Sequence, residues 1–165
     1  MPPAIKFVVL FFVSYLLMQL AYTGYLWIYQ PDIDGLTLFT SQLLLPLFDG
    51  SALVAIPDAA KVQFQINGRA IVNIKEACNG LSVFIALLAF LIAYKGNVKR
   101  YLIFIPLSIV VIFIGNLLRL YALIQIKQFY PESFVFFHEY LFPIILYVFA
   151  FGIMIAWVKS SSNEI

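Results

Sequence analysis

Cys78, Arg119 and His138 are the residues whose types and positions point to chemistry in this chain. Cys78 is the only cysteine and His138 the only histidine, so an internal disulfide or a redox pair of thiols is excluded. One Cys and one His also make a poor transition-metal set, since structural zinc sites use four such ligands. Any catalysis must therefore rest on single copies of each group, and we expect neither a metal nor a cofactor.

The composition places these groups in a membrane protein. The 165 residues are 64% hydrophobic and 11% charged, whereas soluble globular domains are about 45–50% apolar and about 25% charged. A soluble enzyme, a disordered tail and a nucleic-acid-binding domain are therefore excluded. Ten Lys and Arg against eight Asp and Glu imply no polyanionic partner. The sequence predicts an all-α polytopic membrane protein that forms a single integral membrane domain over residues 1–165.

Four apolar stretches are long enough, or nearly so, to cross a hydrocarbon core that takes about 20 helical residues. They are residues 7–29, 77–94, 101–126 and 140–158. The insert between the first two, about 30–76, contains the apolar run Leu36–Phe48, whose length suits an interfacial or re-entrant segment better than a span, and we expect an interfacial helix. Extending this run to Ile56 would give a fifth span with Pro46 and Asp49 inside the bilayer, which is the less favoured alternative.

The second half of the insert predicts a small β-hairpin. Residues 61–66 alternate apolar and polar side chains, Asn67-Gly68 follows, and a second run covers 69–74. Asn-Gly between two such runs is a strong hairpin signal, because both central residues of a type I′ turn need a positive φ. The hairpin is either a lid, a docking edge for an extended peptide or a simple cap, and the sequence does not decide among these.

Positive charge gives a weak indication of orientation. The segment 95–100 holds three Lys or Arg and no acid, which favours the cytoplasm. With four spans both termini are then cytoplasmic and the insert is extracytoplasmic. Cys78 lies at the start of the second span, Arg119 late in the third and His138 just before the fourth. Antiparallel spans therefore bring the three residues to one membrane face.

Each of these residues also has an interpretation without function. A lone Cys is commonly a small buried hydrophobe, and a lone His at a span end is commonly an interfacial polar group. Arg119 is more informative, because an arginine inside a span costs about 2.5–3.5 kcal/mol on insertion scales and is normally retained for function, unless its side chain snorkels to the interface. Asn116, three residues earlier, shares its helical face.

Together the three residues suit nucleophilic catalysis. The thiolate is the attacking form of cysteine, and a helix N-terminus and a nearby cation both favour it. His138 can act as general base and then as acid for a leaving amine. Arg119 can stabilise the thiolate or donate hydrogen bonds to the oxyanion of a tetrahedral intermediate. The pattern predicts a cysteine acyl-transfer site.

Three segments resemble the exosortase/archaeosortase family, which comprises polytopic membrane cysteine transpeptidases of bacteria and archaea. Glu76-Ala77-Cys78-Asn79-Gly80-Leu81 resembles the family's Ala-Cys-Ser-Gly-Leu signature, with Asn79 in place of Ser. Asn116-Leu117-Leu118-Arg119 resembles its arginine, which Asn often precedes by three residues. Phe137-His138-Glu139 resembles its histidine at the head of a later span, without the glycine found nearby in many members. The order Cys, Arg, His is that of the family, and this chain resembles a short, minimal member.

The resemblance implies a thiol protease or transpeptidase, a hydrolase acting on peptide bonds, in the bacterial inner (plasma) membrane. Cys78 would be the nucleophile, and Arg119 and His138 would complete the catalytic set. Its partners would be membrane lipids and membrane-anchored secreted proteins that end in a short motif, one transmembrane helix and a basic tail, but no nucleic acid. Cleavage at the outer membrane interface would give a thioester acyl-enzyme that another nucleophile resolves.

Four further residues are expected to support the site: Glu76, Asn79, Gly80 and Asn116. Glu76 either orients His138 or pairs with Arg119, and the sequence does not decide between these. An alternative function is also open, namely a non-catalytic transporter or assembly factor. In that case Arg119 and Asn116 would hold an anionic lipid or glycan headgroup.

Overall fold

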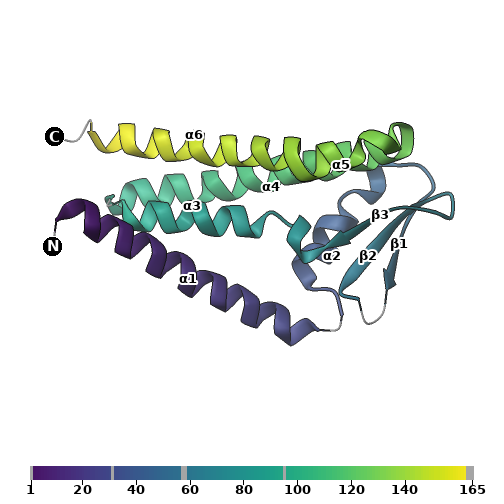
Figure 1. Ribbon diagram of the computed structural model, residues 1–165, viewed down its shortest axis with the longest axis horizontal. Coiled ribbons are helices and arrows are strands. Elements are labelled where there is room, and N and C mark those ends of the chain that lie inside the picture. The colour runs from purple at the N-terminus through teal and green to yellow at the C-terminus, as the bar shows by residue number, and fades with distance from the viewer. Residues whose placement is uncertain (1, 31, 57–58, 95, 163–165) are drawn as a thin grey trace. The chain divides into compact units, whose positions relative to one another are not determined.

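The computed structural model describes residues 2–30, 32–56, 59–94 and 96–162 (Figure 1). Three of its helical segments are long and apolar enough to cross a membrane. They are α1 (Pro3–Tyr29), α4 (Val98–Phe129) and the run Pro131–Ser160, which ends in α6 (Phe142–Ser162). The chain is thus a mostly helical, multi-pass membrane protein, and three of the four predicted spans are confirmed as helices of sufficient length and apolarity.

The second predicted span, 77–94, is shorter than expected. Its helix, α3, covers only Leu81–Ala93. Thirteen residues rise about 20 Å at 1.5 Å each, less than a hydrocarbon core of about 30 Å. The first residues of the predicted span form instead the 3₁₀ turn Glu76–Cys78, called η2. Gly80 separates this turn from the helix with a φ of 78°, a conformation that favours glycine.

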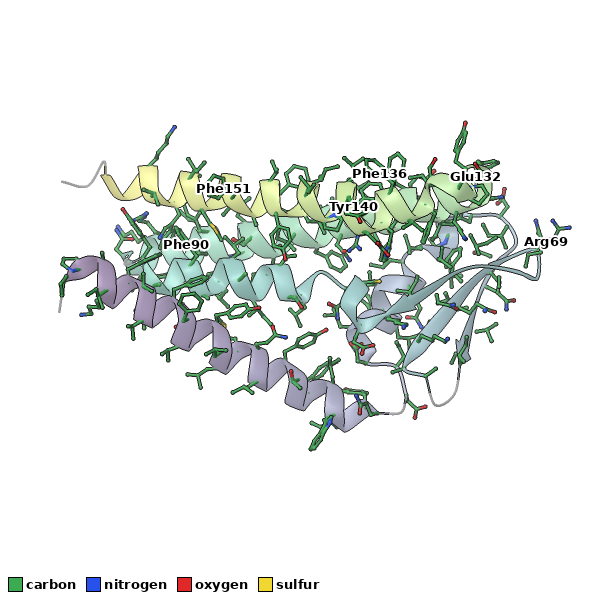
Figure 2. The ribbon with its side chains drawn as sticks, viewed as in Figure 1. Arg69, Phe90, Glu132, Phe136, Tyr140 and Phe151 are labelled. Atoms are coloured by element: carbon green, nitrogen blue, oxygen red, sulfur yellow. The ribbon has the colours of Figure 1, made fainter. Side chains whose placement is uncertain are left out.

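The insert holds a three-stranded antiparallel sheet rather than a hairpin alone. Its strands are β1 (Ser51–Ile56), β2 (Lys61–Ile66) and β3 (Arg69–Lys75), in the order β1-β2-β3. The predicted hairpin is confirmed by the positive φ of 50° at Asn67 and 75° at Gly68. Figure 2 shows Arg69 at the tip of this hairpin.

Strand β1 corrects two expectations for the insert. Its sequence, Ser-Ala-Leu-Val-Ala-Ile, is an apolar run without strict alternation, so periodicity did not identify it as a strand. Because it pairs with β2 along its whole length, the fifth span through Ile56 does not form. The predicted interfacial helix 36–48 is also divided, into α2 (Gly35–Gln42) and the 3₁₀ turn Leu45–Leu47.

The chain divides into two compact units, each with its own hydrophobic core. The first unit comprises the described parts of 1–23, 80–114 and 144–165, and the second comprises those of 24–79 and 115–143. The core of the first unit surrounds Trp157 and includes Leu87, Leu91, Ile112, Ala150 and Ile153. In the second unit the core comprises Phe64, Ile66 and Ile74 of the sheet, Leu120 and Ile124 of α4, and Leu44, which precedes the 3₁₀ turn Leu45–Leu47. Every predicted site residue except Gly80 belongs to the second unit.

Candidate active site

Cys78 ends the 3₁₀ turn that follows strand β3. The turn is closed by the backbone N–H of Asn79, which donates to the carbonyl of Glu76 at 3.2 Å. Cys78 is partly exposed. The expectation that it lies at the N-terminus of the second span's helix is wrong, because α3 begins only at Leu81 and Gly80 is its N-cap. The dipole of a helix acts within its first turn, so the environment of the thiol must come from its neighbours.

Asn116 connects the turn that carries Cys78 to the arginine on α4. Its side chain is fully buried, and its Nδ2 donates to the carbonyl oxygen of Cys78 at 2.7 Å. Its Oδ1 accepts from a terminal nitrogen of Arg119 at 3.5 Å. The three-residue spacing had placed Asn116 and Arg119 on one helical face, and the structure confirms this. Asn116 thereby fixes the position of Cys78 relative to Arg119.

The guanidinium of Arg119 is half-buried and interacts electrostatically with Cys78. Its Nε is buried and has no hydrogen-bond partner among the described residues. A buried donor without a partner costs about 1–3 kcal/mol, and buried polar groups are otherwise nearly always satisfied. Arg119 therefore has unused donor capacity.

His138 lies in a π-helical turn, Phe137–Leu141, within the helical run that ends in α6. Its ring stacks on Phe134 one turn earlier, with centroids 5.4 Å apart, and it interacts electrostatically with Arg119 and Glu139. Single π-helical turns occur frequently at functional sites. The same helical run carries Phe136 and Tyr140, two exposed rings that stack with their centroids 6.2 Å apart (Figure 2).

Cys78 and His138 line one cavity of about 510 Å³. Strand β3 supplies one wall, and the segment that follows α4 supplies Phe134 and His138 on another. The described residues that line it are Gln63, Ala70, Ile71, Val72, Asn73, Lys75, Cys78, Lys127, Phe134 and His138. Lys75 and Lys127 are the only fully charged side chains among these described residues, so this lining is electropositive. Such surroundings favour a thiolate.

The two lysines were not identified from the sequence. Lys127 follows Asn116, Leu120 and Ile124 at helical spacing, so its place on the sheet-facing stripe of α4 could have been found. Lys75 lies three residues before Cys78, but only the end of β3 and the following turn bring both to one cavity. No local pattern signals that arrangement.

Two other residues that were expected to support the site, Glu76 and Asn79, are not among the described residues that line the cavity of Cys78. Glu76 lines a separate small cavity together with Asp32, Asp34 and Tyr29. Asn79 is almost completely buried and donates from Nδ2 to the hydroxyl of Thr37 on α2 at 3.4 Å. Asn79 therefore attaches the Cys78 turn to α2, whose own buried face is polar.

The family model of the transmembrane exosortase matches residues 3–158, which include every residue lining the cavity. The chain belongs to the transmembrane exosortase family. Comparisons with curated proteins and with solved structures give no match. Membership in the exosortase family implies a membrane transpeptidase enzyme whose protein substrates carry sorting signals.

Proposed function

We propose that this exosortase is a cysteine transpeptidase or peptidase with Cys78 as nucleophile, cleaving the C-terminal sorting signals of membrane-anchored secreted proteins. The main support for this proposal is that Cys78 and His138 line one electropositive cavity. In addition, the Asn116 side chain hydrogen-bonds both to the backbone of Cys78 and to the side chain of Arg119. The proposal places this cavity at the outer face of a bacterial inner membrane, with both termini in the cytoplasm.

The first step is attack by the Cys78 thiolate on the carbonyl carbon of the scissile peptide bond. A carbon–sulfur bond forms, and the carbonyl electron pair moves to oxygen to give a tetrahedral oxyanion. Arg119 stabilises first the thiolate and then this oxyanion, because its guanidinium interacts electrostatically with Cys78 and retains an unpartnered donor. Loss of one oxyanion donor typically lowers kcat about 10²–10³-fold.

His138 acts as the general acid and then as the general base. As imidazolium it donates a proton to the leaving amine, so the carbon–nitrogen bond breaks and a thioester to Cys78 remains. As neutral imidazole it then removes a proton from the resolving nucleophile, which is water, a lipid or a glycan. Attack of that nucleophile breaks the carbon–sulfur bond and regenerates the thiolate. Stacking on Phe134 restrains the imidazole at the cavity wall.

The decisive experiment is processing of a co-expressed reporter. The reporter carries the C-terminal segment of a host protein with a motif, a hydrophobic span and a basic tail. Cys78→Ala removes one sulfur and is expected to abolish cleavage, whereas Ser108→Ala, which removes one buried hydroxyl bonded within its own helix, is expected to retain it. Both variants should reach the membrane at the level of the unmodified chain.

The same variants test the alternative of a non-catalytic headgroup-binding protein. The lysines of the cavity favour an anionic ligand, which gives this alternative its support. It requires that Cys78→Ala and His138→Gln retain function while Arg119→Ala does not. Normal reporter cleavage by Cys78→Ala would refute the catalytic proposal.

A further inference from the structure

Strand β3 is an edge of the sheet. Its only neighbour in the strand order is β2, and in the described parts of the chain it makes no other backbone hydrogen bond. An edge strand presents a row of N–H and C=O groups to which an extended chain can add. Strand β1 forms the opposite edge and pairs with β2 alone.

The free edge of β3 faces the cavity of Cys78. Ala70, Asn73 and Lys75 line the cavity from one face of the sheet, because they pair with Gln65, Gln63 and Lys61 of β2, and Gln63 lines the cavity as well. Val72 also lines the cavity but pairs with Phe64, whose side chain lies on the opposite face. Since successive side chains of a strand point to opposite faces, the cavity wall includes both faces of β3 and the edge between them. No residue of β1 lines this cavity. The cavity thus extends along one edge of the sheet and reaches the proposed nucleophile at the end of that strand.

We propose that the substrate segment preceding its hydrophobic span binds in extended conformation as a fourth strand beside β3, with its scissile carbonyl at Cys78. This inference rests on the proposed function. Backbone hydrogen bonds to β3 supply affinity, and alternate substrate side chains face the two sides of the sheet. Phe134 and His138 also line this cavity.

The added strand runs parallel to β3. The cavity extends from Cys78, which follows the end of β3, back to Ala70 near the start of that strand. A substrate segment that precedes the scissile bond and occupies this cavity reaches Cys78 with its carboxyl end. The segment therefore has the same direction as β3.

Disulfide cross-linking tests both the edge and the direction. Replacing the single cysteine, Cys78→Ala, gives a chain into which one new cysteine is introduced on β3, Asn73→Cys or Lys75→Cys. Both positions are exposed and lie on the same face, because they pair with Gln63 and Lys61 of β2. The reporter receives a cysteine at each successive position before its span, and membranes are oxidised. We expect cross-links at alternate reporter positions, with the strongest one moving two residues toward the span when Asn73→Cys is exchanged for Lys75→Cys.

Two further positions complete the design. Ala70→Cys lies on the same face because the bulge between β2 and β3 pairs Ala70 with Gln65, and its strongest cross-link is expected further from the span. Val54→Cys on the opposite edge is exposed and serves as the matched control, for which only background cross-linking is expected.

Several outcomes would overturn the inference. Equal cross-linking to Val54→Cys would show that the reporter contacts both edges. If cross-linked reporter positions do not alternate, the reporter segment is not bound as a strand. If the strongest cross-linked position moves away from the reporter's span when Asn73→Cys is exchanged for Lys75→Cys, the segment is not parallel to β3. The unmodified chain is first shown to process the same reporter, so a failed cross-linking pattern is distinguishable from failure of the proposed function.

Discussion

Each unit holds a buried or half-buried arginine, and the two differ in how their donors are used. In the first unit Arg100 is 7% exposed and donates from Nε to the hydroxyl of Ser160 at 3.1 Å. It also donates to Ser160 and to the carbonyl of Trp157 from a terminal nitrogen, and its guanidinium lies 4.3 Å from the centre of the indole. In the second unit Arg119 has one long hydrogen bond, to Asn116, and a buried Nε without a partner in the described structure.

Under the proposed function, this difference distinguishes a structural arginine, Arg100, from an arginine that takes part in the reaction, Arg119. The donors of Arg100 are engaged by Trp157 and Ser160, and Trp157 is itself fixed by a hydrogen bond from Nε1 to the carbonyl of Tyr94 at 2.8 Å. Arg119 instead interacts electrostatically with the thiol of Cys78 and has donor capacity left over. A buried cation that is incompletely satisfied is costly to keep, which fits a group that completes its hydrogen bonds only when the substrate's oxyanion forms.

The largest expected effect is that of Arg119→Lys. Lysine retains the charge but loses the planar set of donors, so reporter processing should fall about 100-fold with normal membrane levels, in line with the loss of an oxyanion donor. Quantitative immunoblotting of precursor and product measures this. Retention of half or more of the processing rate would remove Arg119 from the catalytic set.

Arg100→Ala should instead act on stability. It removes charged hydrogen bonds worth about 1.5–3 kcal/mol each, and the cation–π contact with Trp157. We expect a clearly lower midpoint of thermal unfolding in detergent, while the folded fraction processes the reporter at the normal rate. A large loss of specific activity in folded protein would erase the distinction between the two arginines.

Two asparagines extend the comparison. Asn116→Ala loses the bond to the Cys78 carbonyl, so kcat is expected to fall about tenfold with little change in KM, since the nucleophile is displaced but the β3 edge is intact. Asn97→Ala removes the side chain that accepts from the backbone N–H of Arg100 at 2.9 Å, which should cost about 1 kcal/mol of stability and no activity. Steady-state assays in proteoliposomes measure kcat and KM for each variant, and thermal unfolding measures its stability. A kcat of Asn116→Ala equal to that of the unmodified chain would refute the positioning role of Asn116.

The smallest effect concerns the hairpin. Gly68 has a φ of 75° in open space, so Gly68→Ala should cost roughly 1 kcal/mol through backbone strain alone. Gly152→Ala, in helix α6 and also without a close neighbour, should be neutral or slightly stabilising. Differential thermal unfolding measures both. A stabilising Gly68→Ala would contradict the type I′ turn.

The sequence alone determined features that depend on nearby residues. Asn67-Gly68 specified the turn because only residues tolerant of positive φ fit it. The long apolar stretches specified the membrane helices because length and hydropathy decide insertion. The Asn116–Arg119 pair followed from helical spacing, and the Cys, Arg and His segments indicated the family.

Tertiary structure decided what depends on distant partners. The run 51–56 became β1 only because β2 provides a partner along its whole length. The bond from Asn116 to Cys78 spans 38 positions in sequence, and Lys75 and Lys127 meet at one cavity although 52 positions separate them. The π-helical turn at His138 also had no local signal. Local propensity fixes turns and helices, whereas the surroundings of a reactive side chain are set by packing between elements that are remote in the chain.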